Sequence, residues 1–262
     1  MFLIADNVQV TRKVVGRAFE ERDPGPVAEI AARCAAAKVD AVDVNMGPVS
    51  RDPEGAAEFF VTAVLSGARL PLWIDTVNPR AMERGLVLAK AAGRPAINGV
   101  SLAPERLEAM AELSVRHDAD LVAYLLTEKG MVCPDADTRL AVAAELWTRL
   151  CGLGVSPERV IVDPVCAPLL WGDGVYQSGE VANTIRLLPD VLGFPVKTVV
   201  GLSNLTTGRA PRDRKERYEA AYLCMLASAG LSHALVNVEH GEVLTYAGVV
   251  GNLRSGRVFS WE

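Results

Sequence analysis

Acidic and amide side chains recur at the ends of short apolar segments in this sequence. Asp75 follows the apolar run 70–74, and Asp43, Asn98 and Asp163 lie in or directly after similar runs. Asp and Asn are depleted in β-strands, so their repeated appearance at these points needs a cause. Any one of them alone could be a turn or helix-cap residue, which both types favour. Together they indicate a binding site.

The chemistry that suits these side chains is recognition of a flat heterocycle rich in N–H and C=O groups. A carboxylate accepts hydrogen bonds from two adjacent donors, and an asparagine amide both donates and accepts. The spacing of His, Cys and Glu matches no metal site, and no G-x-S-x-G nucleophile motif occurs, so we expect no protein-bound metal. The full set of polar residues expected at strand ends is Asp6, Asp43, Asn45, Asp75, Asn98, Asp163, Ser203, Asn204 and Asn237.

Eight strand–helix repeats must position these side chains. Apolar runs predict strands, and helical spacing of apolar residues predicts helices, in strict alternation over 262 residues. This pattern predicts a parallel sheet, and its length favours a single-domain (β/α)₈ TIM barrel spanning residues 1–262. An open dinucleotide-binding sheet is disfavoured because no strand is followed by G-x-G-x-x-G. The expected strands are 2–5, 41–46, 71–76, 96–101, 121–126, 159–164, 196–204 and 233–238, and the expected helices are 26–38, 54–67, 80–92, 104–117, 138–150, 179–192, 215–229 and 242–253.

In such a barrel the carboxyl ends of all strands meet on one rim, where the polar strand ends would converge. Of the three histidines only His240 is expected near that rim, and a histidine base is not the favoured interpretation. Two connections on the same side, 127–137 and 203–214, are longer than usual. The second is polar and basic, which predicts either a mobile lid or a solvated surface loop.

Composition limits the classes of partner. Half of the residues are hydrophobic, which is enough for a large core, and the net charge of -5 argues against nucleic-acid binding. No apolar run reaches the roughly 18 residues of a membrane span, and residues 1–6 lack the basic segment of a signal peptide. The five cysteines follow no pairing pattern. We therefore expect a cytoplasmic protein with reduced thiols and no membrane partner.

Five short motifs occur in the order and spacing of a known family. They are Asp-Val-Asn-Met-Gly-Pro at 43–48, Ile-Asp-Thr-Val-Asn at 74–78, Ile-Asn-Gly-Val-Ser at 97–101, Val-Asp-Pro at 162–164 and Gly-Leu-Ser-Asn at 201–204. The chain thereby resembles the pterin-binding barrel family, and specifically its methyltetrahydrofolate:corrinoid methyltransferase branch. The resemblance extends over essentially the whole chain, including 21–24 and 137–141.

Dihydropteroate synthase, another branch of this family, is the poorer match. The synthase typically carries Ser-Thr-Arg-Pro-Gly after its second strand and Ser-Arg-Lys after its seventh. The corresponding places here read Met-Gly-Pro-Val at 46–49 and Ser-Asn-Leu at 203–205.

The resemblance implies a role for each matching residue. Asp75, Asn98 and Asp163 would hydrogen-bond the pterin ring, and Asn204 would reach the N5 region of the folate. Asp43 and Asn45 would support the pterin pocket, and Ser203 would position the loop that carries Asn204. The first strand departs from the family, because Asp6-Asn7-Val8-Gln9 stands where members often have Glu-Arg-Ile-Asn. No role is carried over for Asp6 or Gln9.

The implied activity is methyl transfer between N5 of (methyl)tetrahydrofolate and the cobalt of a corrinoid. The chain lacks the Asp-x-His-x-x-Gly signature of a corrinoid-binding module, so a separate corrinoid protein would be the partner. The family also implies a homodimer. Two alternatives stay open: a dihydropteroate synthase-like pterin enzyme, and a non-catalytic folate-binding subunit of a methyltransferase complex. The sequence leaves the direction of transfer open.

Overall fold

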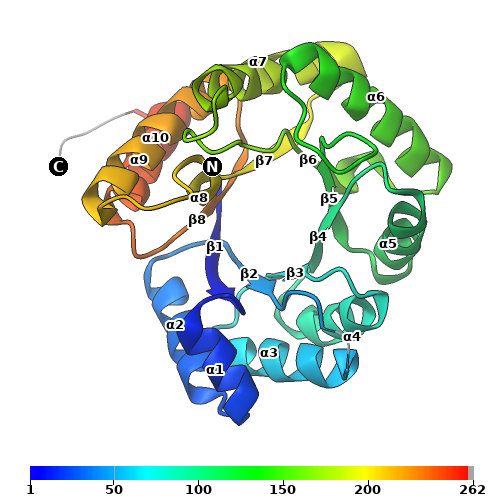
Figure 1. Cartoon of the computed structure of the whole chain (residues 1–262), viewed down its shortest axis with the longest axis vertical. Coiled ribbons are helices and arrows are strands. Elements are labelled where there is room, and N and C mark those ends of the chain that lie inside the picture. Colours follow the sequence, from blue (N-terminus) through cyan, green and yellow to red (C-terminus); the bar gives the residue numbers. More distant parts are fainter. Residues whose placement is uncertain (50, 259–262) are drawn as a thin grey trace.

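Eight parallel strands close into a barrel in sequence order, which confirms the predicted (β/α)₈ fold (Figure 1). The computed structural model describes residues 1–49 and 51–258; residues 50 and 259–262 of the predicted 1–262 domain lie outside the described residues. The pairing of β1 with β8, which starts at Phe2 and His233, completes the closure. The strands are β1 (Phe2–Gln9), β2 (Ala41–Asn45), β3 (Leu72–Asp75), β4 (Ala96–Val100), β5 (Asp120–Tyr124), β6 (Val160–Asp163), β7 (Lys197–Gly201) and β8 (His233–Val236).

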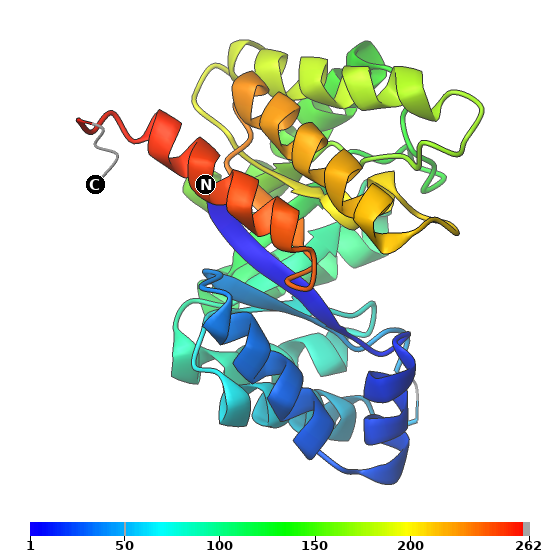
Figure 2. The same cartoon turned by 90° about the vertical axis from the view of Figure 1, so that its left-hand side faces the viewer.

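Helices surround the barrel, as the views along and across it show (Figures 1 and 2). Side chains of Asp52, Asn78 and Asp135 cap the first turns of α3, α4 and α6, because their oxygens accept from free backbone N–H groups there. No helix in 1–49 or 51–258 is long and apolar enough for a membrane span. The helices are α1 (Lys13–Glu21), α2 (Gly25–Ala36), α3 (Pro53–Gly67), α4 (Pro79–Ala89), α5 (Pro104–His117), α6 (Ala136–Gly152), α7 (Gly174–Leu192), α8 (Leu202–Leu205), α9 (Arg212–Ala229) and α10 (Gly241–Arg254), with 3₁₀ turns at Lys90–Ala92 and Pro157–Arg159.

The structure differs from the predicted elements at several points, for example at β1, which runs to Gln9 instead of 5, and at α7, which begins at Gly174 instead of 179. The sequence pattern missed α1, a short helix with a glycine, Gly16, in its middle. The seventh strand ends at Gly201 instead of 204, and the next residues form the helical turn α8. Because α9 begins at Arg212, the irregular part of the predicted 203–214 loop shrinks to 206–211.

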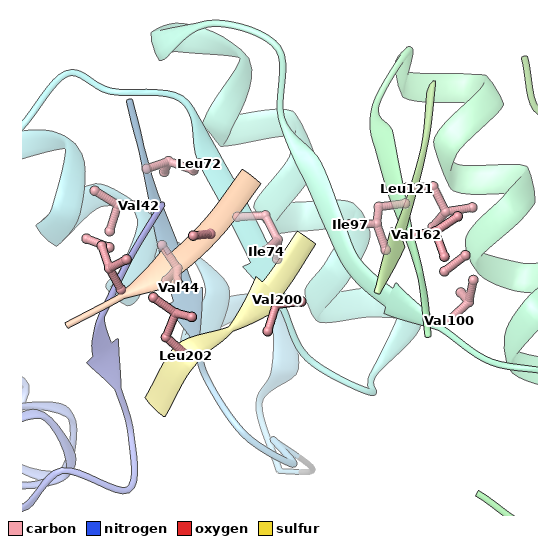
Figure 3. Close-up of a cluster of buried hydrophobic side chains, with 14 of the residues drawn as sticks. Val42, Val44, Leu72, Ile74, Ile97, Val100, Leu121, Val162, Val200 and Leu202 are labelled. Atoms are coloured by element: carbon pink, nitrogen blue, oxygen red, sulfur yellow. The ribbon is translucent and has the colours of Figure 1, made fainter. Parts of the chain in front are cut away.

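Alternation along the strands divides the core in two. One residue from every strand contributes to an apolar layer inside the barrel: Ile4, Ala41, Trp73, Ala96, Val122, Ile161, Val199 and Leu235. The neighbouring residues, such as Val42, Ile74 and Val162, belong instead to the core between the barrel and its helices (Figure 3). Since side chains alternate with a period of two, the residue two positions beyond each member of the apolar layer again faces the barrel interior, one layer nearer the rim.

Candidate active site

A ring of mostly polar side chains lies directly above the apolar layer. Counting two residues on from each member of that layer reaches Asp6, Asp43, Asp75, Asn98, Tyr124, Asp163, Gly201 and Asn237. All of these except Asn237 line one cavity of about 270 Å³. The other lining residues are Gln9, Asn45, Leu126, Val165, Ser203, Asn204 and Leu235. The seven residues predicted as catalytic or substrate-binding are therefore brought together in a single cavity at the barrel rim.

Hydrogen bonds fix the orientation of two amides that line this cavity, those of Asn98 and Asn45. Nδ2 of Asn98 donates to Oδ1 of Asp43 over 2.8 Å, and Oδ1 of Asn98 accepts from the Tyr124 hydroxyl at 2.8 Å. Nδ2 of Asn45 donates to Oδ2 of Asp75 at 2.5 Å, and Oδ1 of Asn45 accepts from the Gly47 N–H. The bonds to Asp43 and Asp75 each occupy one oxygen of the carboxylate.

Burial dominates the electrostatics of the cavity. It raises the pKa of Asp163 to about 7, although the Val165 N–H donates to that carboxylate. It raises the pKa of Asp75 to about 6, with the Arg106 guanidinium acting in the opposite direction. The pKa of Asp43 lies well above its usual value because of burial and of the charge on Asp75. At each of these carboxylates, burial outweighs the hydrogen bonds and the positive charges that stabilise the ionised form.

Asp6, on β1 beside β2, has the same character. Burial raises its pKa, and a 2.9 Å hydrogen bond from the Ser203 hydroxyl offsets part of that effect. Across the described residues, no lysine, arginine or histidine side chain forms an ion pair with any of these four acids. A ligand that complements this cavity must therefore bring N–H donors of its own.

The turn α8 carries Ser203 and Asn204 to the edge of the cavity. The Asn204 side chain is exposed and lies over Gly201, where an added Cβ would come within 3.3 Å of its Nδ2 atom. Beyond the turn, the Thr206 hydroxyl donates to Oε1 of buried Glu219 at 2.5 Å. The other carboxylate oxygen of Glu219 lies 2.6 Å from Nδ1 of His240. This network, Thr206–Glu219–His240, attaches α8 to α9 and to the start of α10.

The histidines and Asn237 lie outside the cavity. His240, expected near the rim, lies behind α8 with its Nδ1 on Glu219. His233 packs against Phe2 and Trp73 at the other end of the barrel, and burial lowers its pKa to about 4. Oδ1 of Asn237 accepts from Nδ2 of Asn7 at 2.7 Å and from the Glu239 N–H, so its amide closes the β1–β8 seam.

Sequence reasoning missed Tyr124 and two supporting arginines. Tyr124 carries a clear signal, since it stands two residues after Val122, as Asp163 does after Ile161. Arg139 is fully buried and donates from Nε to the carbonyl oxygen of Pro164 at 2.9 Å, directly after Asp163. Arg106 donates to the Gly99 carbonyl at 2.8 Å, directly after Asn98. These contacts support the ends of β6 and β4, and the local sequence pattern does not predict them.

The carboxylates and amides of the cavity suit a donor-rich heterocycle. No group of three or more His, Cys, Asp or Glu side chains suitable for a metal occurs among residues 1–49 and 51–258. The carboxylates face the cavity from separate strands, so each can accept from a different edge of a flat ring. The fold and the position of the cavity are those of the (β/α)₈ barrel enzymes, which bind their ligands at the carboxyl-terminal rim.

The chain belongs to the family of pterin binding enzymes, whose model matches residues 14–237. Its fold is similar to solved dihydropteroate synthases. The synthase from Xanthomonas albilineans has 19% identity and a TM-score of 0.68, over 98% of this chain and 94% of that one. The synthase from Thermus thermophilus has 19% identity and a TM-score of 0.66 over 98% and 94%. The synthase from Yersinia pestis, solved with a pterine-sulfa conjugate, has 16% identity and a TM-score of 0.66 over 97% and 94%.

Proposed function

We propose that this chain is a methyltransferase that moves a methyl group between N5 of tetrahydrofolate and the cobalt of a corrinoid held by a separate protein. The observation that carries the proposal is the position of Asn204. Its amide stands at the open edge of a cavity whose walls bear four carboxylates. A pterin ring bound in that cavity would present N5 near its mouth.

Asp75, Asp163 and Asn98 would hold the pterin. The ring offers an amino group and adjacent ring N–H, and charge-assisted hydrogen bonds from such donors contribute about 1.5–3 kcal/mol each. Asp43 would act through Asn98, whose amide it orients at 2.8 Å. Asn45 would act in the same way on Asp75. The carboxylates of Asp75 and Asp163 accept hydrogen bonds best when ionised. The N–H donors of a bound pterin would therefore stabilise the ionised form of these buried acids.

Asn204 would act on the methyl-bearing nitrogen. When the methyl group leaves, the C–N electron pair remains on N5, and the resulting anion is too basic unless N5 is protonated or strongly hydrogen-bonded. The oxygen of the Asn204 amide can accept from a protonated N5 without titrating itself, and such a preorganised dipole contributes on the order of a few kcal/mol. The corrinoid of the partner protein would supply the cobalt(I) nucleophile. The proton itself would come from solvent at the open edge.

A dihydropteroate synthase activity is the second candidate, because the similar solved folds are synthases. That reaction expels pyrophosphate, a group that arginine and lysine side chains stabilise. Among the described residues, none of those that line the cavity is basic. This lining is the reason why we propose methyl transfer first. A mixture of pterin pyrophosphate and p-aminobenzoate decides between the two, since only a synthase would form dihydropteroate.

The deciding assay follows cobalt(I) corrinoid with methyltetrahydrofolate spectroscopically, in both directions. We expect turnover in the wild-type protein and a loss of orders of magnitude in Asn204→Ala, while folate binding largely survives. Unchanged turnover in Asn204→Ala would show that the role given to this residue is wrong. Folate binding without methyl transfer to any corrinoid protein would instead indicate a non-catalytic folate-binding subunit.

We also propose that the protein is a homodimer through the outer face of α9 and α10, which lie alongside each other (Figure 2). Met225, Tyr246, Val249 and Leu253 are all more than two fifths exposed there. Contiguous exposed apolar side chains of this kind mark association surfaces. Sedimentation of the wild-type protein and of Leu253→Glu tests the assignment.

A further inference from the structure

A second cavity, of about 350 Å³, lies on the far side of α8 from the first. Leu205, the residue that follows Asn204 in the sequence, lines this second cavity together with Leu169 and Leu170. The Leu169 N–H donates to the Leu205 carbonyl at 3.0 Å, which joins the β6–α7 loop to α8 between the two cavities. Tyr218 of α9 and Val175 of α7 complete the apolar part. Both belong to the opening turns of their helices, so this cavity also opens on the barrel rim.

Three cations border this second cavity. Arg209, Arg214 and Lys215 line it, and no acidic residue does so within the described chain. None of the three forms an ion pair with any described residue, whereas nearby Arg212 and Arg217 are paired with acids on α9. The amino-terminal end of α9 adds its own positive field. An apolar wall beside unneutralised positive charge fits a ligand with an aromatic body and an anionic end.

Folate has such a segment at the required place. Its p-aminobenzoyl-glutamate tail leaves the ring at C6, the carbon adjacent to N5. If N5 lies at Asn204, the tail would leave the first cavity beside α8. Leu205, the next residue after Asn204, lines the second cavity, so the tail would enter it there. The volume lies at the lower end of the range typical for small-molecule sites, about 300–1,000 Å³, and so suits a tail rather than a whole folate.

We propose that the second cavity binds the benzoylglutamate tail and that Arg209, Arg214 and Lys215 pair with its glutamate carboxylates. The inference rests on the proposed function and extends it to a substrate class. Each added glutamate brings another carboxylate, so the protein prefers folates that carry several glutamates over those that carry one. The mutual repulsion of the three cations is relieved when such a ligand is bound.

The experiment compares three ligands by calorimetry: a tail-less tetrahydropterin, methyltetrahydrofolate with one glutamate, and the same compound with three. The test protein combines Arg209→Ala, Arg214→Ala and Lys215→Ala. The control combines Arg33→Ala, Arg69→Ala and Lys90→Ala, which removes the same charge from exposed positions at the opposite end of the barrel. We expect wild type and control to bind the triglutamate most tightly. The test protein should lose about tenfold in affinity for it and lose nothing for the tail-less pterin.

Other outcomes overturn one idea or the other. Equal affinity of wild type and test protein for the triglutamate contradicts the tail site and leaves the pterin site intact. Failure of the wild-type protein to bind even the tail-less pterin contradicts the proposed function itself. If the test protein binds all three ligands normally and only its methyl transfer to a corrinoid protein is slowed, the surface serves the partner protein, and the tail assignment is wrong.

Discussion

The layer that a side chain occupies in the barrel decides, more than its residue type does, whether it packs in the core or lines the cavity. Val122 and Tyr124 show the rule, since the first seals the barrel and the second reaches the cavity two residues later. Where the upper position is acidic, the carboxylate is buried without a cation, which costs free energy in the empty protein. A ligand that supplies N–H donors recovers that free energy. The unfavourable burial of each acid is thus evidence about the ligand.

Asp75→Ala should weaken folate binding before anything else. The side chain lines the cavity and accepts from Asn45, so its loss removes charge-assisted hydrogen bonds to the pterin and frees the Asn45 amide. We expect affinity to fall by about 10–100-fold, from the usual strength of such bonds. Titration of folate by fluorescence measures it. Asp190→Ala, an exposed acid at the carboxyl end of α7, is the matched control. A normal affinity in Asp75→Ala contradicts the role given to that carboxylate.

Gly201→Ala tests how closely Asn204 must be held. The new methyl group would lie 3.3 Å from Nδ2 of Asn204, and the exposed amide can yield by a few tenths of an ångström. Small displacements of a catalytic group slow a reaction strongly, so we expect kcat to fall by about tenfold. Folate affinity and the melting temperature should stay near wild type. Gly248→Ala, with open space around it on α10, provides the comparison. An unchanged kcat would mean that the amide does not act on the reacting atoms.

Among the elements, α8 is the one whose structure the local sequence pattern predicts least well. The apolar run Val199, Val200, Gly201 and Leu202 continues past the true strand end, so the local pattern predicts a longer strand. The structure turns there instead, because Ser203 bonds Asp6 and the Leu205 carbonyl accepts from Leu169. Both partners lie far away in the sequence. The eight strands themselves could be predicted, since runs of buried Val, Ile and Leu depend only on neighbouring residues.

Thr206→Val should loosen α8 without changing the cavity. The substitution keeps the shape of the side chain and removes the hydroxyl that donates to buried Glu219. We expect a loss of stability of about 1 kcal/mol, the usual net value of one hydrogen bond, together with a several-fold fall in kcat. KM for folate should change little, because the pterin contacts come from other strands. Thr245→Val on exposed α10 is the control. Equal losses of kcat in both variants would rule out a positioning role for the Glu219 network.

The whole molecule combines a rigid apolar barrel with an acidic cavity at one end. The apolar layer and the helices could be predicted from the sequence, and so could the convergence of the strand-end acids on one rim. The raised pKa values could not, because they depend on burial by residues from other strands. Because these pKa values are raised, the buried acids make the protein less stable as pH rises. Acids whose pKa is lowered by ion pairs have the opposite effect.

Ligand-free protein should become less stable as pH rises from about 4 to 8. Folding raises the pKa of Asp163 from its usual value to about 7, so the folded state holds this proton more tightly than the unfolded state. The resulting stability is fully present below the unfolded pKa and is lost as pH rises through about 7. Asp75, with its pKa near 6, adds to the loss at slightly lower pH. Each such group costs at most about 1.4 kcal/mol per pH unit while only the unfolded form is ionised.

Asp163→Asn isolates this contribution. An amide of the same shape carries no charge at any pH, so the melting temperature of the ligand-free variant should exceed that of wild type at pH 8 and approach it at pH 4.5. Folate binding should show the reverse order, because the neutral amide offers the pterin a weaker acceptor than the ionised carboxylate. Differential scanning calorimetry at both pH values, with and without folate, measures both effects. A variant that is less stable than wild type at pH 8 without ligand would show that Asp163 is held by its surroundings rather than waiting for a donor.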